Sequence, residues 1–168
     1  MRLFVAAIGA VMLAGPAAAA AQQMGAAVSA QAETAHYRLL LRIGPQEKMY
    51  SKADADKMHP ASGEIMAGGM MAGMDMGTGM TMDMRHLEVH VVDRATGKVI
   101  TTAACAITVT NDATKTSTAV SPVAMYGAKE GPSDWHYGNN VAMPPGSYTV
   151  KVAVNGEQAA FHVTIPKM

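Results

Sequence analysis

The sequence is poor in cysteine, aromatic residues and net charge, and each shortage excludes a class of protein. A single cysteine, Cys105, cannot form an internal disulfide bond. Aromatic residues make up 5% of the chain, so its core must be mainly aliphatic. A formal net charge of zero provides no attraction for nucleic acid or anionic lipid. Because no Ser–His–acid set, Cys–His set or phosphate-binding loop is visible, we expect no enzymatic activity.

Long hydrophobic runs are also missing, apart from one near the start of the chain. Arg2 precedes an apolar stretch over residues 3–14, and a run of alanines over residues 17–21 follows. This is the pattern of a secretory signal peptide, and we predict cleavage after Ala21. The apolar stretch is too short to span a bilayer comfortably. We therefore expect an exported protein, periplasmic in a host with two membranes, whose mature chain is not inserted in a membrane.

Short alternating segments separated by turns predict an all-β fold. Residues 22–35 lack useful periodicity and are predicted to be a flexible N-terminus, whereas residues 36–168 are predicted to form one domain. Asn155-Gly156 indicates a tight hairpin, and a helical turn is expected near residues 52–58. The predicted fold is an immunoglobulin-like antiparallel β-sandwich with a long Met/Gly-rich loop at residues 66–84. The expected strands cover residues 36–43, 86–93, 98–111, 117–125, 147–154 and 159–165.

What the sequence has in abundance is methionine. Eight of the sixteen methionines fall between Met66 and Met84, among five glycines that oppose a helix. Spacings such as Met80-x-Met82-x-Met84 would let neighbouring sulfurs converge on one ion. Thioether is a soft ligand that stays neutral and suits copper. A flexible linker and a store of oxidisable sulfur remain alternatives for the same run.

The methionine run leads directly into a strand that carries imidazole and carboxylate groups. His86, Glu88 and His90 alternate with aliphatic residues and so share one face of the strand. Residues two apart on a strand lie roughly 6 to 7 Å from each other, which lets His86 and Glu88 approach one ion or two adjacent ions. By the same rise His90 lies about 13 Å from His86, too far to share a mononuclear site without a bulge.

A second polar segment, Ser133-Asp-Trp-His136-Tyr-Gly-Asn-Asn-Val-Ala-Met-Pro144, together with His86-Leu87-Glu88, resembles the periplasmic iron-transport protein family. The resemblance covers roughly residues 85–165. It implies a secreted, dimeric, immunoglobulin-like domain that binds copper and assists an inner-membrane iron permease.

Carried onto this sequence, the resemblance implies that His86, Met125 and His136 are copper ligands. Glu88 and Asp134 would be neighbouring acids for a second, harder ion such as iron. The chain departs from the family pattern because it has only Trp135 between Asp134 and His136 and a longer spacing from Met125. It also lacks a histidine in the final hairpin, so the fourth donor must come from elsewhere or be absent. The methionine loop is the first candidate for this donor, followed by His90, His162 and His36.

Three hypotheses follow from these residues. The first is a periplasmic protein that binds copper through His and Met ligands and takes part in Fe²⁺ transport. The second is a Cu(I) carrier or sequestration protein that uses the Met-rich loop and has no connection with iron. The third is an exported sandwich that binds another protein, with the methionines serving as a linker.

Overall fold

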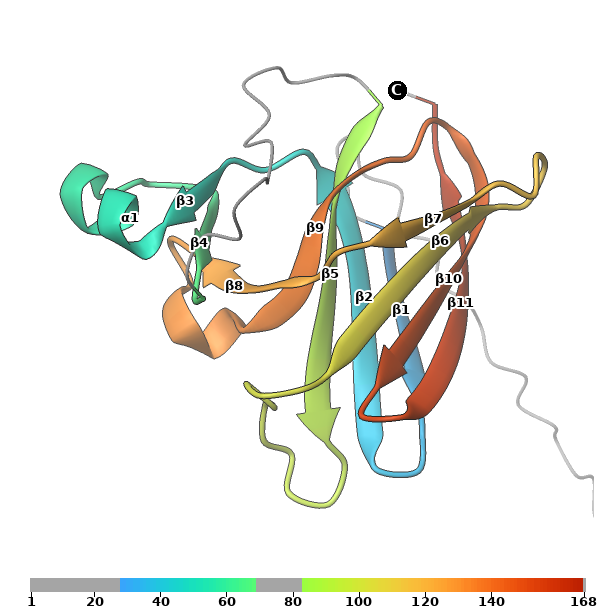
Figure 1. Ribbon diagram of the computed structural model, residues 1–168, viewed down its shortest axis with the longest axis horizontal. Coiled ribbons are helices and arrows are strands. Elements are labelled where there is room, and N and C mark those ends of the chain that lie inside the picture. Colours follow the sequence, from blue (N-terminus) through green and yellow to red (C-terminus); the bar gives the residue numbers. More distant parts are fainter. Residues whose placement is uncertain (1–27, 69–82, 168) are drawn as a thin grey trace, which may run out of the picture.

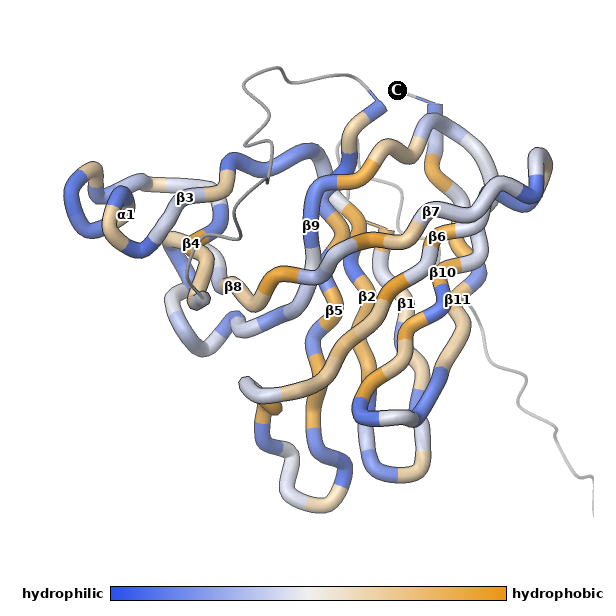
Figure 2. The backbone as a smooth tube through the Cα atoms, viewed as in Figure 1, coloured by the Kyte–Doolittle hydropathy of each residue, from blue (hydrophilic) through white to orange (hydrophobic). Residues whose placement is uncertain are grey.

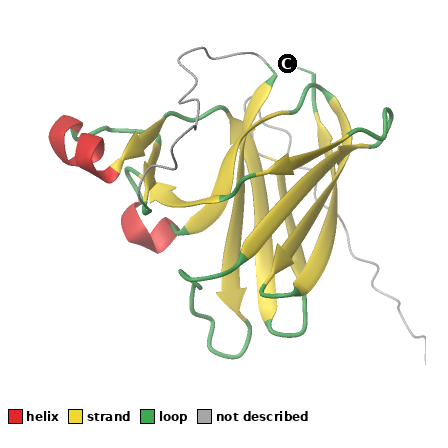
Figure 3. Cartoon of the chain, in the orientation of Figure 1, coloured by secondary structure: helices red, strands yellow, loops and turns green. Residues whose placement is uncertain are grey.

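The structure is a computed structural model that describes residues 28–68 and 83–167 (Figure 1). Within these residues more than half of the chain is β-strand, with one short α-helix and one 3₁₀ helix (Figure 3). The elements in chain order are β1 (Val28–Glu33), β2 (Tyr37–Pro45), β3 (Met49–Ser51), α1 (Lys52–Met58), β4 (Glu64–Met66), β5 (Met84–Asp93), β6 (Cys105–Asn111), β7 (Ser117–Val120), β8 (Val123–Gly127), η1 (Gly131–Asp134), β9 (His136–Ala142), β10 (Gly146–Val154) and β11 (Glu157–Ile165).

The strands form two sheets that pack face to face. The larger sheet has the order β1-β2-β5-β9-β8-β4-β3, and the smaller one has the order β11-β10-β6-β7. All strand pairs are antiparallel except β3 with β4. The prediction of an all-β sandwich is therefore confirmed.

The hydrophobic core lies between the sheets and is built from aliphatic side chains on alternate strand positions. Leu39 and Leu41 of β2 and Leu87, Val89 and Val91 of β5 are completely buried, as the alternation predicted. Figure 2 shows hydrophobic residues concentrated along the strands that face each other and hydrophilic residues at the turns. The smaller sheet contributes mainly Ile107, Val109, Val150, Val152, Val154, Phe161, Val163 and Ile165.

The structure differs from the sequence prediction in several segments. Residues 28–33 lie in the stretch predicted to be a flexible N-terminus, but they form strand β1 and pair with β2. Its inward positions are Val28, Ala30 and Ala32, whose small side chains give only a weak hydrophobic signal. The single strand expected over residues 117–125 is two strands, because the chain leaves the smaller sheet after β7 and enters the larger sheet at β8. Pro122 lies at this crossing.

A further difference is β9, which lies outside the strands predicted from the sequence. Gly138, Asn139 and Asn140 are typical of turns, yet they lie in a central strand between β5 and β8. The strand expected over residues 98–111 is correspondingly shorter and begins at Cys105.

A small lobe, formed by β3, α1 and β4, extends from the end of the larger sheet (Figure 1). Helix α1 lies where the helical turn was predicted. Ser51 caps its first turn by accepting a hydrogen bond from the backbone N–H of Asp54, and His59 ends it in a left-handed conformation. Among the described residues, no helix is long and apolar enough to cross a bilayer.

Candidate metal centre

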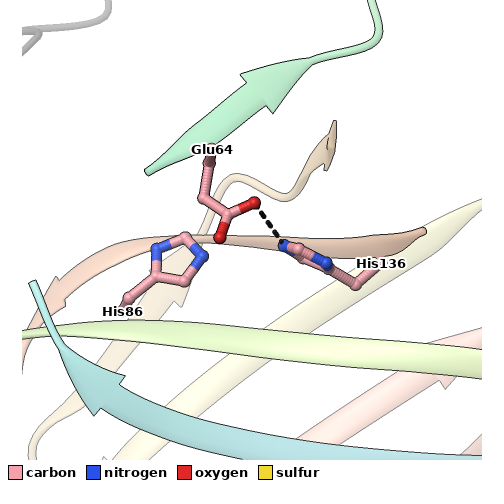
Figure 4. A group of neighbouring side chains, drawn as sticks. All are labelled: Glu64, His86 and His136. Carbon is pink, nitrogen blue, oxygen red and sulfur yellow. Dashed lines mark ion pairs between the residues drawn. The ribbon is translucent and has the colours of Figure 1, made fainter. Parts of the chain in front are cut away.

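Three side chains from three different strands meet outside the hydrophobic core. Glu64 of β4, His86 of β5 and His136 of β9 each offer a ligand atom, and these atoms lie within 4.8 Å of one another (Figure 4). In a flat sheet β4 and β5, three strand spacings apart, would be separated by about 14 Å. The larger sheet must therefore curl, so that β4 lies across from β5 and its carboxylate reaches the imidazoles. We call Glu64, His86 and His136 the inner group.

The orientation of the His86 ring is set by Asn140. The amide nitrogen of Asn140 donates to the carbonyl of Glu47 at 2.8 Å, and its Oδ1 accepts from the backbone N–H of Glu47 at 3.2 Å. Oδ1 also lies 3.1 Å from Nδ1 of His86. Since Oδ1 only accepts, Nδ1 of His86 must carry the proton. The lone pair is then on Nε2, which is buried and has no hydrogen-bond partner.

His136 is oriented in the same way by a backbone carbonyl. Its Nδ1 lies 2.8 Å from the carbonyl oxygen of Asp134, which only accepts, so this nitrogen also carries the proton. The lone pair of Nε2 points toward Glu64 and likewise has no hydrogen-bond partner. Metal-binding histidines commonly donate their second N–H to a carbonyl or amide oxygen, as both of these do.

Glu64 completes the inner group. It is 6% exposed, so bulk water does not solvate its carboxyl group. Burial, followed by repulsion from Glu88 and other acidic side chains, raises its pKa to about 8. Its Oε2 has no hydrogen-bond partner and lies 3.4 Å from Nε2 of His136. That separation is long for a hydrogen bond, but two donors about 2.0 Å from one tetrahedral ion lie about 3.3 Å apart.

Both imidazoles are kept neutral by burial, as a metal ligand must be. His86 and His136 are completely buried. Burial lowers the pKa of His86 to about 4 and also lowers the pKa of His136. Two neutral imidazoles and one carboxyl group, all with unsatisfied buried atoms, form a donor set that fits a transition metal ion.

A second set of ligand atoms shares His136 with the first. Glu88, His90 and His136 offer atoms that also lie within 4.8 Å of one another, and we call them the outer group. His90 Nε2 is 3.2 Å from Glu88 Oε2. Burial would raise the pKa of Glu88, but the hydrogen bond with His90 and the nearby imidazoles together lower it. Glu88 is thus held as a carboxylate.

Acidic side chains crowd the outer group, and a guanidinium group faces them. Arg42 Nη1 lies 3.6 Å from a carboxylate oxygen of Asp134 and 3.9 Å from one of Glu88. Asp134 is also 3.8 Å from Nδ1 of His136, so the acid predicted beside the site does lie beside it. The outer group is more exposed than the inner group, and the neighbouring Asp134 carboxylate adds oxygen donors that suit a harder cation.

The sequence-predicted site residues fall into three sets. His86, Glu88, His90, Asp134 and His136 gather on one side of the larger sheet, with the rings of His86 and His136 5.8 Å apart. His86 belongs to the inner group and Glu88 to the outer group, and the two groups meet at His136. Met125 is completely buried directly opposite His136, and Met84 begins β5. Met80 and Met82 lie outside the described residues.

The sequence prediction missed Glu64 and Asn140. Glu64 stands two residues before the methionine run, in a polar segment without a clear pattern, and only the curl of the sheet brings it to the histidines. Asn140 lies in β9, outside the strands predicted from the sequence. The remaining histidines considered as a fourth donor are elsewhere, since His36 pairs with Glu157 and His162 is exposed on β11 of the other sheet.

The fold and the site together define a β-sandwich whose buried His/Glu group fits metal binding. No protein-family model and no curated protein sequence matches this chain. A solved structure of FetP from uropathogenic Escherichia coli strain F11, a copper-bound point variant, is similar. The identity is 12% and the TM-score 0.52, with coverage of 85% of this chain and 98% of that chain. At this identity the similarity shows a shared fold.

Proposed function

We propose that this protein binds copper through His86 and His136, with Glu64 and Met125 completing the donor set. The observation that carries the proposal is the pair of imidazole Nε2 atoms, both buried and both without a hydrogen-bond partner. Oε2 of Glu64 is a third such atom. An unsatisfied buried polar atom costs about 1–3 kcal/mol, so three of them at one point are best explained by an ion that they bind together. Copper is the choice because imidazole and thioether lie together and because the similar FetP structure is copper-bound.

The proposal extends to the biological setting. The N-terminal segment supports export to a periplasm, and the resemblance of residues 85–165 supports a role in Fe²⁺ transport as a homodimer beside an iron permease. The outer group supports the same role, since Glu88 with Asp134 offers hard oxygen donors next to the copper ligands. Iron would be the cargo of this system and copper the resident ion.

Metal analysis of the purified protein tests the proposal. We expect near-stoichiometric copper in competition with a mild chelator, and its loss in His86→Ala and in His136→Ala. His162→Ala is the matched control, because this histidine is exposed on the other sheet. Circular dichroism establishes that each variant is folded. Wild-type protein that retains neither copper nor iron would overturn the proposal.

A Cu(I) carrier is the second candidate function, favoured by where the methionine run joins the site. Met66 follows Glu64 by two residues, and Met84 precedes His86 by two. Deleting residues 69–82 removes no residue of β4 or β5. If the protein is a Cu(I) carrier, this deletion removes most of the Cu(I) bound while iron uptake by the cells stays unchanged. If it serves iron transport, inactivating the gene lowers iron uptake.

A further inference from the structure

Two methionines continue the row of side chains that begins at His136. In β8, Met125 lies directly opposite His136 of β9, and in β4, Met66 lies directly opposite Met125. Directly opposed residues of antiparallel strands project from the same face, with Cβ atoms about 4.5–5.5 Å apart. Imidazole, thioether and thioether therefore follow one another across three neighbouring strands, on the face that carries the inner group.

Packing of the hydrophobic core does not account for these two side chains. Met66 is 2% exposed and Met125 is completely buried, yet neither belongs to the hydrophobic core between the sheets. Met143, which is equally buried, does belong to it. Met66 and Met125 are instead buried on the face of the larger sheet that carries the inner group.

Strand β4 presents two kinds of donor to the same place. Glu64 and Met66 are two residues apart on an extended strand, so both project from the face that reaches the imidazoles. Glu64 already has its carboxyl group within 4.8 Å of His86 and His136 ligand atoms. The oxygen donor and the sulfur donor therefore arrive on a single element.

We infer that Met66 is a metal ligand and that Met66 with Met125 makes the centre selective for Cu(I) over Cu(II). The inference rests on the proposed function and adds the oxidation state of the ion. Thioether sulfur is a soft donor that stabilises Cu(I), whereas carboxylate and imidazole suit the harder Cu(II) as well. Met66 then takes the place of the missing histidine of the final hairpin as the fourth donor.

The variant Met66→Leu tests the inference, because leucine keeps the volume and removes the sulfur. Cu(I) affinity is measured under ascorbate by competition with bathocuproine disulfonate, and Cu(II) affinity is measured in air by competition with a second chelator. We expect Cu(I) affinity to fall by about tenfold or more, the scale on which metal sites respond to loss of a supporting group. We expect Cu(II) affinity to change much less.

Two controls carry the same substitution elsewhere. Met143→Leu replaces a methionine of the hydrophobic core, and Met58→Leu replaces one that is 65% exposed on α1. Neither should change Cu(I) affinity. Wild-type Cu(I) affinity in folded Met66→Leu, or an equal loss for Cu(I) and Cu(II), would overturn the inference and leave the proposed function standing. Failure of the wild-type protein to bind copper in either state would overturn both.

Discussion

At the scale of single residues, Asn140 connects His86 of the inner group to the segment that leads into the lobe. Its Oδ1 accepts from the His86 ring and from the backbone of Glu47, while its Nδ2 donates to the carbonyl of Glu47. One amide therefore fixes which nitrogen of His86 faces the inner group and also holds the segment that leads into β3. Only asparagine and glutamine carry a donor nitrogen and an acceptor oxygen in one side chain, and glutamine is longer by one methylene.

Replacing Asn140 by alanine should weaken metal binding without removing any ligand. The His86 ring would lose the acceptor for its Nδ1–H and could rotate or change tautomer. We expect copper affinity to fall by about 10–100-fold, as is usual when the partner of a metal-binding histidine is removed.

The matched control for this substitution is Asn111→Ala, in β6 of the smaller sheet. The Asn111 side chain accepts from the backbone N–H groups of Ala113 and Thr114, in the turn that follows β6. Copper titration of the two folded variants makes the comparison. Equal affinities in Asn140→Ala and wild type would show that Asn140 does not position His86.

At the scale of elements, the contact between β5 and β9 brings the two histidines together. Gly138 lies directly opposite Glu88 in this ladder. A Cβ atom added at Gly138 would lie 1.9 Å from the carbonyl oxygen of Leu87, a backbone atom that cannot move aside alone. Glycine at this position therefore permits the close approach of the two strands.

Gly138→Ala should force β5 and β9 apart and lower both stability and metal affinity. We expect the free energy of unfolding to fall by about 2–4 kcal/mol, in the range of a severe steric clash in a core strand. Urea denaturation with and without copper measures the effect. Gly68→Ala is the control, because an added Cβ there meets no atom within 4 Å. Unchanged stability in Gly138→Ala would contradict the close approach.

The strands that the sequence predicts well are those whose aliphatic residues alternate. β2, β5, β10 and β11 bury valine, leucine and isoleucine on one face, and local pattern alone is enough to find them. β9 could not be found in this way, because its Gly138 permits the close approach of β5 and its Asn140 orients His86 of the same strand. Their roles depend on residues 50 or more positions away, which a local pattern does not contain.

The candidate site was predictable to a similar extent. His86, Glu88 and His136 stand in recognisable segments, and the structure brings them to one side of the larger sheet. Glu64 comes from β4, a three-residue strand next to the last strand of the larger sheet, and so short a strand shows no periodicity in the sequence. Its contribution depends on sheet curvature, a property of the whole fold.

At the scale of the whole molecule, the two sheets are tied together along one edge by polar contacts. Glu157 at the start of β11 accepts from the backbone N–H of His36 at 3.0 Å and also pairs with the His36 ring. Nearby, the amide of Asn155 donates to the Tyr37 hydroxyl. Hydrogen bonds from Thr34 and His36 lower the pKa of Glu157 to about 2.

The lowered pKa of Glu157 predicts an acid-dependent loss of stability. Above pH 4.5 the carboxylate is ionised in both folded and unfolded chains, so its contribution is fully present. As the pH falls from about 4.5 to about 2, only the unfolded chain takes up the proton, and the contribution is lost.

Thermal melting of wild type and Glu157→Gln across this range checks the expectation. The stability difference between them should be constant above pH 4.5 and should vanish near pH 2. Glu33→Gln removes an exposed carboxylate that pairs with Arg94 on the same edge and serves as the control. A difference that does not change with pH would show that the Glu157 carboxylate is not specifically stabilised.

The lobe that carries Glu64 is attached to the rest of the larger sheet by a ladder of only three residue pairs between β4 and β8. Backbone hydrogen bonds at Ala67 and Ala128 and the Asn140 contact with Glu47 add to this attachment. Short ladders at the end of a sheet open far more often than the protein unfolds. We therefore expect the residence time of an ion at the inner group to depend on fraying of this edge, and metal exchange to be fast while the sandwich stays intact.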